Sequence, residues 1–131
     1  MSTRVLIAED VDVVRETLAA ILDLEEGLEV IASLATGDGI VPEALRCQPD
    51  VALLDIDLPG TDGLTAAAEL RDRLPSCRVL ILTGLAGPDV LDHARAAGVA
   101  GFLVKDERAD TLIDAVRRVA RGERVFPVEP L

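Results

Sequence analysis

Short aliphatic runs alternate with amphipathic stretches five times along this 131-residue chain. The aliphatic runs have the length of strands, and the stretches after them repeat apolar residues at helical spacing. The expected strands are 4–8, 28–34, 50–54, 78–82 and 101–104, and the expected helices are 11–24, 40–47, 64–74, 88–97 and 109–121. Strands that alternate with helices in this way predict an α/β domain with a parallel sheet.

The composition of each run indicates its place in the sheet. The run from Val51 to Leu54 is wholly apolar, as a central strand covered on both faces requires. The run 28–34 is more polar and is expected at an edge. Right-handed crossovers then favour the strand order 2-1-3-4-5, in a doubly wound fold with five helices. The face of the first helix expected to pack on the sheet carries Val14, Leu18, Ile21 and Leu22.

Polar side chains follow four of the expected strands at the same end. Glu9 and Asp10 follow the first strand, Asp55 the third, Thr83 the fourth and Lys105 the fifth. In open parallel sheets, ligands bind outside the carboxyl ends of the strands, where the strand order reverses. The expected order places strands one and three side by side at that point. Glu9, Asp10 and Asp55 should therefore converge.

Three converging carboxylates need a proton or a cation, because at an effective dielectric of about 20 each close pair costs a few kcal/mol. Magnesium suits such a cluster, since it prefers oxygen ligands and keeps an open side for a phosphate. Asp55 could then act as a nucleophile toward phosphorus. Thr83 would donate a hydrogen bond, and Lys105 would supply a positive charge, to the phosphoryl oxygens.

Three of these residues also have a purely structural interpretation. Asp10 or Asp12 could be the N-cap of the first helix. Thr83 alone is typical of a turn, and Lys105 alone is typical of a solvated surface. Their occurrence together at equivalent strand ends favours a functional site.

Composition and charge limit the classes of partner. A formal net charge of −11, from 24 acidic and 13 basic groups, disfavours binding of this chain to nucleic acid or anionic lipid. The chain has no Trp or Tyr to stack on bases. Cys47 and Cys77 lack partners at zinc-binding spacing, and isolated thiols indicate a reducing, cytosolic compartment. No stretch reaches the length of a membrane span, and the first apolar run is too short for a signal peptide.

Four segments occur in order along the chain: Glu9-Asp10, Leu54 to Gly63, Thr83-Gly84 and Gly101 to Lys105. With these segments the sequence resembles, over essentially its whole length, the receiver domains of two-component response regulators. The resemblance implies a flavodoxin-like (CheY-like) fold. It also implies a stoichiometric phosphoacceptor with self-catalysed phosphotransfer and dephosphorylation, rather than a turnover enzyme.

The resemblance implies a role for each residue of the site. Asp55 matches the phosphoacceptor. Glu9 and Asp10 match the residues that bind Mg²⁺, or Mn²⁺ in its place, together with Asp55 and the backbone carbonyl of Asp57. Lys105 matches the lysine that contacts the phosphoryl group.

A switch is also implied. Thr83 and Phe102 correspond to the switch pair of the family, in which the hydroxyl moves toward the phosphoryl group and the aromatic ring turns inward. Asp57 and Leu85 correspond to positions that tune the lifetime of the acyl phosphate. The apolar Leu85 is expected to shield the phosphoryl group from water, and a half-life of seconds would contradict this.

Asp106 stands directly after Lys105, where most receivers have a proline in a cis peptide. This departure resembles the NarL/LuxR-type (FixJ-like) subfamily. It implies a receiver over 1–123 and, over 124–131, the start of a linker toward a helix-turn-helix domain absent from this chain. The implied partners of this cytoplasmic protein are a cognate sensor histidine kinase and a second copy, in a homodimer formed on phosphorylation through the first or last helix. DNA would be bound, and transcription controlled, only through the missing domain, and no membrane is involved.

Other functions stay open from the sequence. Asp55-Ile56-Asp57 superficially fits the Asp-x-Asp motif of haloacid-dehalogenase-like phosphatases. In that class the motif ends the first strand, whereas here a separate acidic pair does. A stand-alone receiver would lack an output domain, and a pseudo-receiver would keep the fold without phosphorylation. Intact Asp55, Thr83 and Lys105 disfavour the pseudo-receiver.

Overall fold

The computed structural model describes residues 2–84, 87–105 and 108–127. These residues contain a five-stranded parallel sheet of order β2-β1-β3-β4-β5, which confirms the expected fold class and strand order. The strands are β1 (Thr3–Ala8), β2 (Leu28–Leu34), β3 (Val51–Leu54), β4 (Arg78–Thr83) and β5 (Gly101–Val104). The helices are α1 (Asp12–Asp23), α2 (Ile40–Cys47), α3 (Gly63–Arg73), α4 (Pro88–Ala96) and α5 (Ala109–Ala120).

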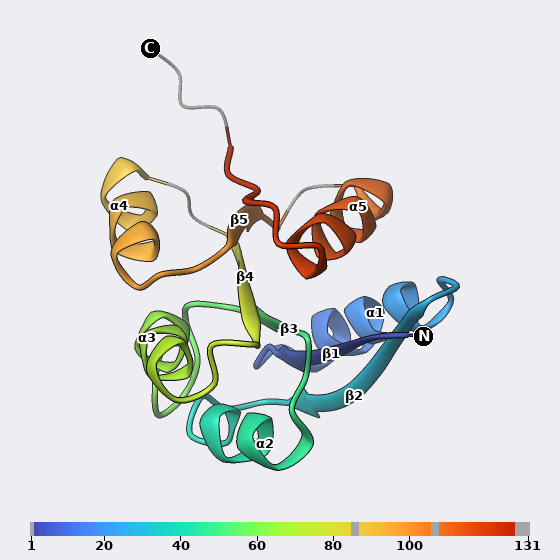
Figure 1. The fold of residues 1–131 in the computed structure, drawn as a ribbon, viewed down its shortest axis with the longest axis horizontal. Coiled ribbons are helices and arrows are strands. Elements are labelled where there is room, and N and C mark those ends of the chain that lie inside the picture. The colour runs from blue at the N-terminus through green and yellow to red at the C-terminus, as the bar shows by residue number, and fades with distance from the viewer. Residues whose placement is uncertain (1, 85–86, 106–107, 128–131) are drawn as a thin grey trace.

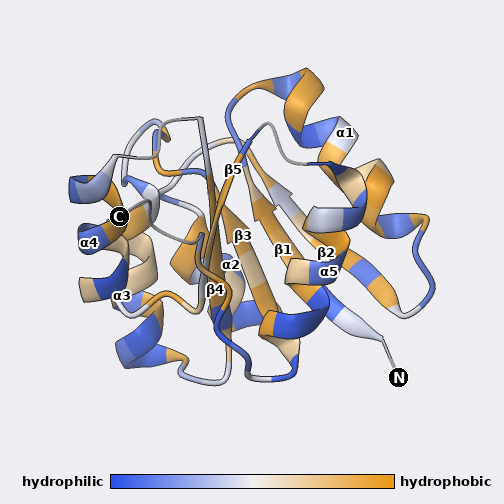
Figure 2. Cartoon of the chain, turned by 90° about the horizontal axis from the view of Figure 1, so that it is seen from above, coloured by the Kyte–Doolittle hydropathy of each residue, from blue (hydrophilic) through white to orange (hydrophobic). Residues whose placement is uncertain are grey.

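Helices cover both faces of the sheet, with α1 and α5 on one face and α2, α3 and α4 on the other (Figure 1). The side chains of β1 alternate between the two cores. Val5 and Ile7 pack with α1 and α5, whereas Leu6 and Ala8 pack on the opposite side. Figure 2 shows apolar strands between helices that carry polar residues on their outer sides. Burial on both faces explains why the strands read as continuous aliphatic runs.

The expected elements agree with the structure to within one residue at their ends. β2 lies at an edge as expected, and within it only Leu28 is buried. One residue of α1 differs from expectation. Leu18 and Leu22 are buried in the core and Val14 packs against it, whereas Ile21 is only half-buried and, beside Val14 and Leu18, lines a groove of about 260 Å³ between α1 and α5. Among the described residues, no helix has the length and apolar character needed to cross a membrane.

The described C-terminal residues lie along the sheet. Val125 forms an isolated parallel bridge with Gly101, beside the outer edge of β5. Phe126 is half-buried and packs against the core on the α2–α4 side. The apolar pattern of the sequence does not indicate this packing. A linker over 124–131 stays a prediction, and residues 128–131 lie outside the described part.

The two cysteines differ in environment, and this predicts their reactivity. Cys77 is buried, and burial raises the pKa of its thiol to about 12. Cys47 is partly exposed. At about pH 8, we therefore expect a disulfide reagent to label one thiol of the native protein rapidly, because only the thiolate reacts. Both thiols should react in denaturant, and Cys47→Ser should leave no fast-reacting thiol. Rapid labelling of Cys77 in the native protein would contradict this assignment.

Candidate functional site

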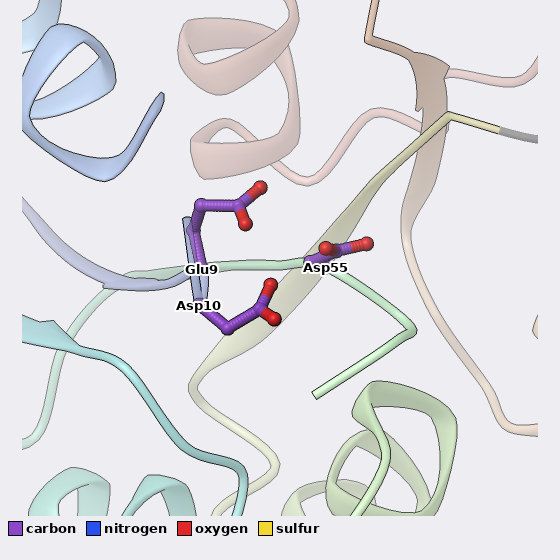
Figure 3. Close-up of side chains that lie close together, drawn as sticks. All are labelled: Glu9, Asp10 and Asp55. Carbon is purple, nitrogen blue, oxygen red and sulfur yellow. The ribbon is translucent and has the colours of Figure 1, made fainter. Parts of the chain in front are cut away.

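Three carboxylates meet at the carboxyl ends of β1 and β3. Glu9 and Asp10 directly follow β1, and Asp55 directly follows β3 (Figure 3). The two strands are paired, and the Asp55 N–H donates to the Ala8 carbonyl at 3.0 Å. One oxygen from each carboxylate lies within 4.8 Å of the others. The convergence expected from strand order is therefore confirmed.

Glu9 is held tightly at this site. Its side chain is 1% exposed, and its backbone N–H donates to the Leu34 carbonyl of the neighbouring β2 at 2.9 Å. One carboxylate oxygen, Oε2, accepts from the Val11 N–H at 2.9 Å. The other, Oε1, contacts the Lys105 ammonium but has no hydrogen bond of normal geometry among the described residues. That buried oxygen is paired in charge and still able to accept a further ligand.

Lys105 bridges the carboxylates from the end of β5. Its Nζ lies 3.0 Å from Asp55 Oδ2 and contacts Glu9 Oε1. Its backbone N–H donates to the Thr83 carbonyl at 2.8 Å, which fixes the start of the side chain beside β4. Burial alone would lower the pKa of Lys105, but the hydrogen bonds and charges of Glu9 and Asp55 raise it above its ordinary value. Lys105 is the only lysine in the sequence, in which all other basic side chains except one histidine are arginines.

Asp10 is exposed and does not cap α1. The N-cap of α1 is Val11, without a side-chain hydrogen bond, and Asp12 pairs with Arg15 at 2.7 Å instead. The structural interpretation of Asp10 as a cap is therefore wrong. Its carboxylate instead lies in the cluster with those of Glu9 and Asp55 (Figure 3).

Arg15 is a residue of this region that the sequence did not single out. Its guanidinium donates to the Glu9 carbonyl at 2.9 Å and also contacts Asp12. Its side chain is only 17% exposed, so these contacts hold the turn that carries Glu9 and Asp10. The sequence places Arg15 in the first turns of the helix. It does not indicate that the Arg15 side chain bonds back to the residue that follows β1.

Arg15→Gln is expected to weaken Mg²⁺ binding about tenfold, because partners that orient ligands contribute this much to metal affinity. Titration calorimetry of the purified protein measures the effect. Arg4→Gln is a matched control, since the Arg4 guanidinium also donates to a loop carbonyl, that of Gln48, but at the opposite end of β1. Equal affinities in the two variants would show that Arg15 only supports the helix.

The cluster fits a hard divalent cation. Its donors are carboxylate oxygens, which Mg²⁺ and Mn²⁺ prefer. The buried Glu9 Oε1 lacks a hydrogen bond of normal geometry within the described structure, and Asp10 is open to solvent. Glu9, Asp10 and Asp55 would hold the ion. Asp57 is exposed two residues after Asp55, its side chain is outside the cluster, and the role of its carbonyl stays a prediction.

The two expected switch residues lie on neighbouring strands. Thr83 ends β4 and is 3% exposed, and Phe102 in β5 has no exposed surface. The Phe102 ring packs in the core on the α2–α4 side, so it occupies the inward position. The switch role of Thr83 and Phe102 stays a prediction. Leu85 and Asp106, for which the sequence suggested roles, lie outside the described residues.

The loop after Asp55 turns back tightly onto the strand end. The Gly63 N–H donates to the Ile56 carbonyl at 2.9 Å. A β-carbon on Gly63 would lie 2.1 Å from the Asp55 carbonyl oxygen, which leaves no room for a side chain. Asp62 caps α3 by accepting from the Thr65 N–H at 2.9 Å. The glycine therefore allows the helix to begin directly against the candidate phosphoacceptor.

Comparison with known proteins gives consistent results. Residues 5–117 match the family model described as response regulator receiver domain. The transcriptional regulatory protein DesR of Bacillus subtilis is 39% identical over 125 residues, which cover 95% of this chain and 62% of DesR. A signal receiver domain from Mycobacterium tuberculosis, assigned to the response regulator NarL, superposes with a TM-score of 0.90 at 32% identity, covering 93% of this chain and 98% of that one.

A LuxR-family two-component response regulator from Aurantimonas gives the same TM-score of 0.90 at 26% identity, covering 95% of this chain and 89% of that one. The chain spans about three fifths of the length of the curated relatives it matches, as the 62% of DesR illustrates. The similarity thus covers one domain of longer regulators.

Proposed function

This chain belongs to the response regulator receiver domain family, with LuxR-family regulators among its relatives, and we propose that Asp55 is its phosphoacceptor. The observation that carries the proposal is the position of the Asp55 carboxylate. It is 6% exposed, touches the only lysine of the chain, and lies within 4.8 Å of two further carboxylates.

In the proposed reaction, an Asp55 carboxylate oxygen attacks the phosphorus of a phosphohistidine on a sensor kinase. The O–P bond of an acyl phosphate forms, and the P–N bond to the histidine breaks. The leaving imidazole keeps the electron pair of that bond and takes up a proton from water. Lys105 stabilises the charge on the phosphoryl oxygens, and the Thr83 hydroxyl donates a hydrogen bond to them.

A divalent cation held by Glu9, Asp10 and Asp55, with the Asp57 carbonyl, would neutralise charge on the carboxylates and the phosphoryl oxygens. Lys105 is the mobile charge of the site. Its Nζ now contacts both Glu9 and Asp55, and it would move to the phosphoryl oxygens when Asp55 is modified. The change in the Lys105 contact would in turn be sensed by Thr83 and Phe102.

The proposed output is transcriptional control through a LuxR-type DNA-binding domain outside this chain. In this account the protein is cytoplasmic and forms a homodimer on phosphorylation. The groove between α1 and α5 supports a contact there, because it is lined mainly by apolar side chains. Val13 of α1, which lines the groove, is 68% exposed.

A phosphatase of the haloacid-dehalogenase class receives less support. In that class, the second aspartate of the Asp-x-Asp motif would act beside the first. Here the acidic groups beside Asp55 come from β1, whereas Asp57 is exposed outside the cluster. A receiver should stop at one adduct per chain and show no repeated hydrolysis of p-nitrophenyl phosphate.

Intact mass spectrometry tests the function. Incubation with acetyl phosphate and Mg²⁺ is expected to add a single phosphoryl group, about 80 Da, to the wild-type protein. Chelation of Mg²⁺ should suppress the adduct. Asp55→Asn, which keeps the size of the side chain, should show none. An adduct that persists in Asp55→Asn, or its complete absence from the folded wild type, would contradict the proposal.

A further inference from the structure

The edge strand β2 supplies none of the three carboxylates of the acidic cluster, but the chain at its end contacts both halves of the site. On one side, the Leu34 carbonyl accepts from the Glu9 N–H at 2.9 Å. On the other side, residues 37–38 lie against residues 59–61, which we call the loop tip. The loop tip belongs to the loop that follows Asp55. The end of β2 therefore joins the segment that carries Glu9 to the segment that carries Asp55.

Asp38 holds the loop tip with one carboxylate oxygen. Its Oδ1 accepts from the Thr61 N–H at 3.0 Å and from the Thr61 hydroxyl at 2.8 Å. Hydrogen bonds to a carboxylate are about twice as strong as those between neutral groups. Asp38 is exposed, whereas Thr61 is half-buried. The Asp38 side chain thus fixes both the backbone and the side chain of Thr61 to the turn before α2.

The two segments approach each other too closely for side chains at their contact. The Gly37 N–H donates to the Pro59 carbonyl at 3.0 Å, and a β-carbon on Gly37 would overlap the Thr61 carbonyl oxygen. A β-carbon on Gly60 would overlap the Asp38 carboxylate. Gly60 also has a φ of +81°, which glycine adopts without strain. A glycine on each segment therefore allows the backbone and the carboxylate to meet directly.

The loop tip bounds the short segment that carries Asp57. The Gly63 N–H donates to the Ile56 carbonyl at 2.9 Å and closes this segment at its root. Leu58, directly after Asp57, is buried in the core. Asp57 itself is exposed and makes no hydrogen bond within the described residues. The direction of the Asp57 carbonyl therefore depends on the anchored residues on either side of it.

We infer that Asp38 is a positioning residue: through Thr61 it holds the Asp57 carbonyl where the cation of the acidic cluster would bind. The inference rests on the proposed function, which includes the role of that carbonyl. The Asp38 carboxylate is outside the cluster, so it acts on the ion only through the loop. Mg²⁺ requires near-ideal octahedral geometry, and a ligand carbonyl that is free to turn binds it poorly.

Titration calorimetry with Mg²⁺ and with Ca²⁺ tests the positioning role. Asp38→Ala is expected to weaken Mg²⁺ binding about tenfold, the lower end of the loss caused by removing a partner that orients a metal ligand. Ca²⁺ binding should weaken by less than about threefold, because Ca²⁺ accepts irregular coordination. Asp38→Asn keeps an oxygen that can accept from Thr61. It should bind Mg²⁺ within about threefold of the wild type, since salt screens the loss of an exposed charge.

Amide hydrogen exchange of the metal-free protein gives a readout that does not depend on the ion. In Asp38→Ala, the Thr61 amide should exchange about tenfold faster, because it has lost its acceptor. The Leu53 amide in the central strand β3 should stay protected, which shows that the domain is folded. Thr61→Val removes only the hydroxyl and should cost less Mg²⁺ affinity than Asp38→Ala. The double variant should bind Mg²⁺ as Asp38→Ala does, because the hydroxyl acts only through Asp38.

Asp23→Ala is the matched control. Asp23 is also an exposed aspartate that joins two elements by accepting a backbone N–H, that of Val30 at 2.9 Å, but it lies near the amino end of β2. This variant should keep the wild-type affinities for both ions. Equal losses of Mg²⁺ and Ca²⁺ affinity in Asp38→Ala, a loss as large in Asp38→Asn, or a Mg²⁺ affinity equal to that of Asp23→Ala would each overturn the positioning role.

Intact mass separates this inference from the proposed function. Asp38→Ala should need about tenfold more Mg²⁺ than the wild type to reach half of its maximal rate of phosphorylation by acetyl phosphate. Saturating Mg²⁺ should restore the wild-type rate. If both proteins gain the adduct with the same Mg²⁺ dependence, the positioning role is overturned and the proposed function stands. If no adduct forms on the folded wild type, the proposed function fails, and the Mg²⁺ and Ca²⁺ affinities still decide the role of Asp38.

Discussion

Lys105→Met should slow the phosphorylation of Asp55 by about a hundredfold, the usual cost of removing one group that stabilises charge in a transition state. The same variant should bind Mg²⁺ about threefold to tenfold more tightly, because at a few ångström a unit charge still repels a cation appreciably. Both effects follow from one contact. The ammonium of Lys105 pairs with Glu9 and Asp55, the carboxylates that would hold the ion. Removing the Lys105 ammonium therefore weakens the stabilisation of charge on the phosphoryl oxygens. It also removes a positive charge that competes with Mg²⁺ for the carboxylates of Glu9 and Asp55.

The prediction is specific because Lys105→Met should slow phosphorylation and yet tighten Mg²⁺ binding. Lys105→Arg keeps the charge and should leave Mg²⁺ affinity near that of the wild type. Rates are measured by intact mass at a fixed acetyl phosphate concentration, and affinities by titration calorimetry. Weaker Mg²⁺ binding in Lys105→Met would show that the lysine supports the cluster structurally rather than sharing it with a cation.

The ion pairs of Lys105 should also survive across the neutral range of pH. Glu9 and Asp55 raise its pKa above the ordinary lysine value, although burial opposes them. A raised pKa in the folded state gives stabilisation that is full below the ordinary lysine pKa and is lost as pH rises through the raised value. From neutral pH upward, the contribution of Lys105 to stability should therefore fall only in alkaline solution, where the ammonium loses its proton.

Gly63→Ala should destabilise the domain by about 3 kcal/mol, in the upper part of the range for overpacking. A β-carbon at this position would lie 2.1 Å from the Asp55 carbonyl oxygen and 2.9 Å from its carbonyl carbon. Both obstacles are backbone atoms at the end of a buried strand, so no flexible side chain can move aside. The strain should also displace Asp55 and slow its phosphorylation beyond the loss of folded protein.

Urea denaturation with circular dichroism measures the change in the free energy of unfolding. Gly39→Ala is the matched control, because its β-carbon would meet only the Leu34 side chain, at 3.7 Å. That variant should change stability by less than about 0.5 kcal/mol, as is usual away from such contacts. Similar stabilities of the two variants would show that the Asp55 loop can relax to accept a side chain.

The sequence predicts much of this fold because the signals are local. Aliphatic runs such as Val51 to Leu54 mark buried strands, and the right-handedness of crossovers then restricts the strand order. The convergence of Glu9, Asp10 and Asp55 follows from that order without knowledge of any side-chain position. Strand ends can therefore place a site from sequence alone.

Contacts between distant segments are harder to predict. The bond from Arg15 to the Glu9 carbonyl depends on how α1 turns away from β1, which periodicity does not fix. The attachment of Val125 to β5 depends on where the chain runs after α5. The two prolines in residues 124–131 indicate a segment outside the core rather than one bonded to a strand. The burial of Phe102 depends on how α4 and Phe126 pack over β5, which the apolar pattern of the strand itself does not fix.

The most direct test of the central claim is to locate the phosphoryl group by chemistry at the residue itself. Borohydride reduces an aspartyl phosphate to homoserine, which tandem mass spectrometry identifies by position. After treatment with acetyl phosphate and Mg²⁺, reduction should place homoserine at residue 55 alone. Homoserine at position 10 or 57, or an unreduced Asp55 in folded protein that has gained a phosphoryl group, would contradict the account.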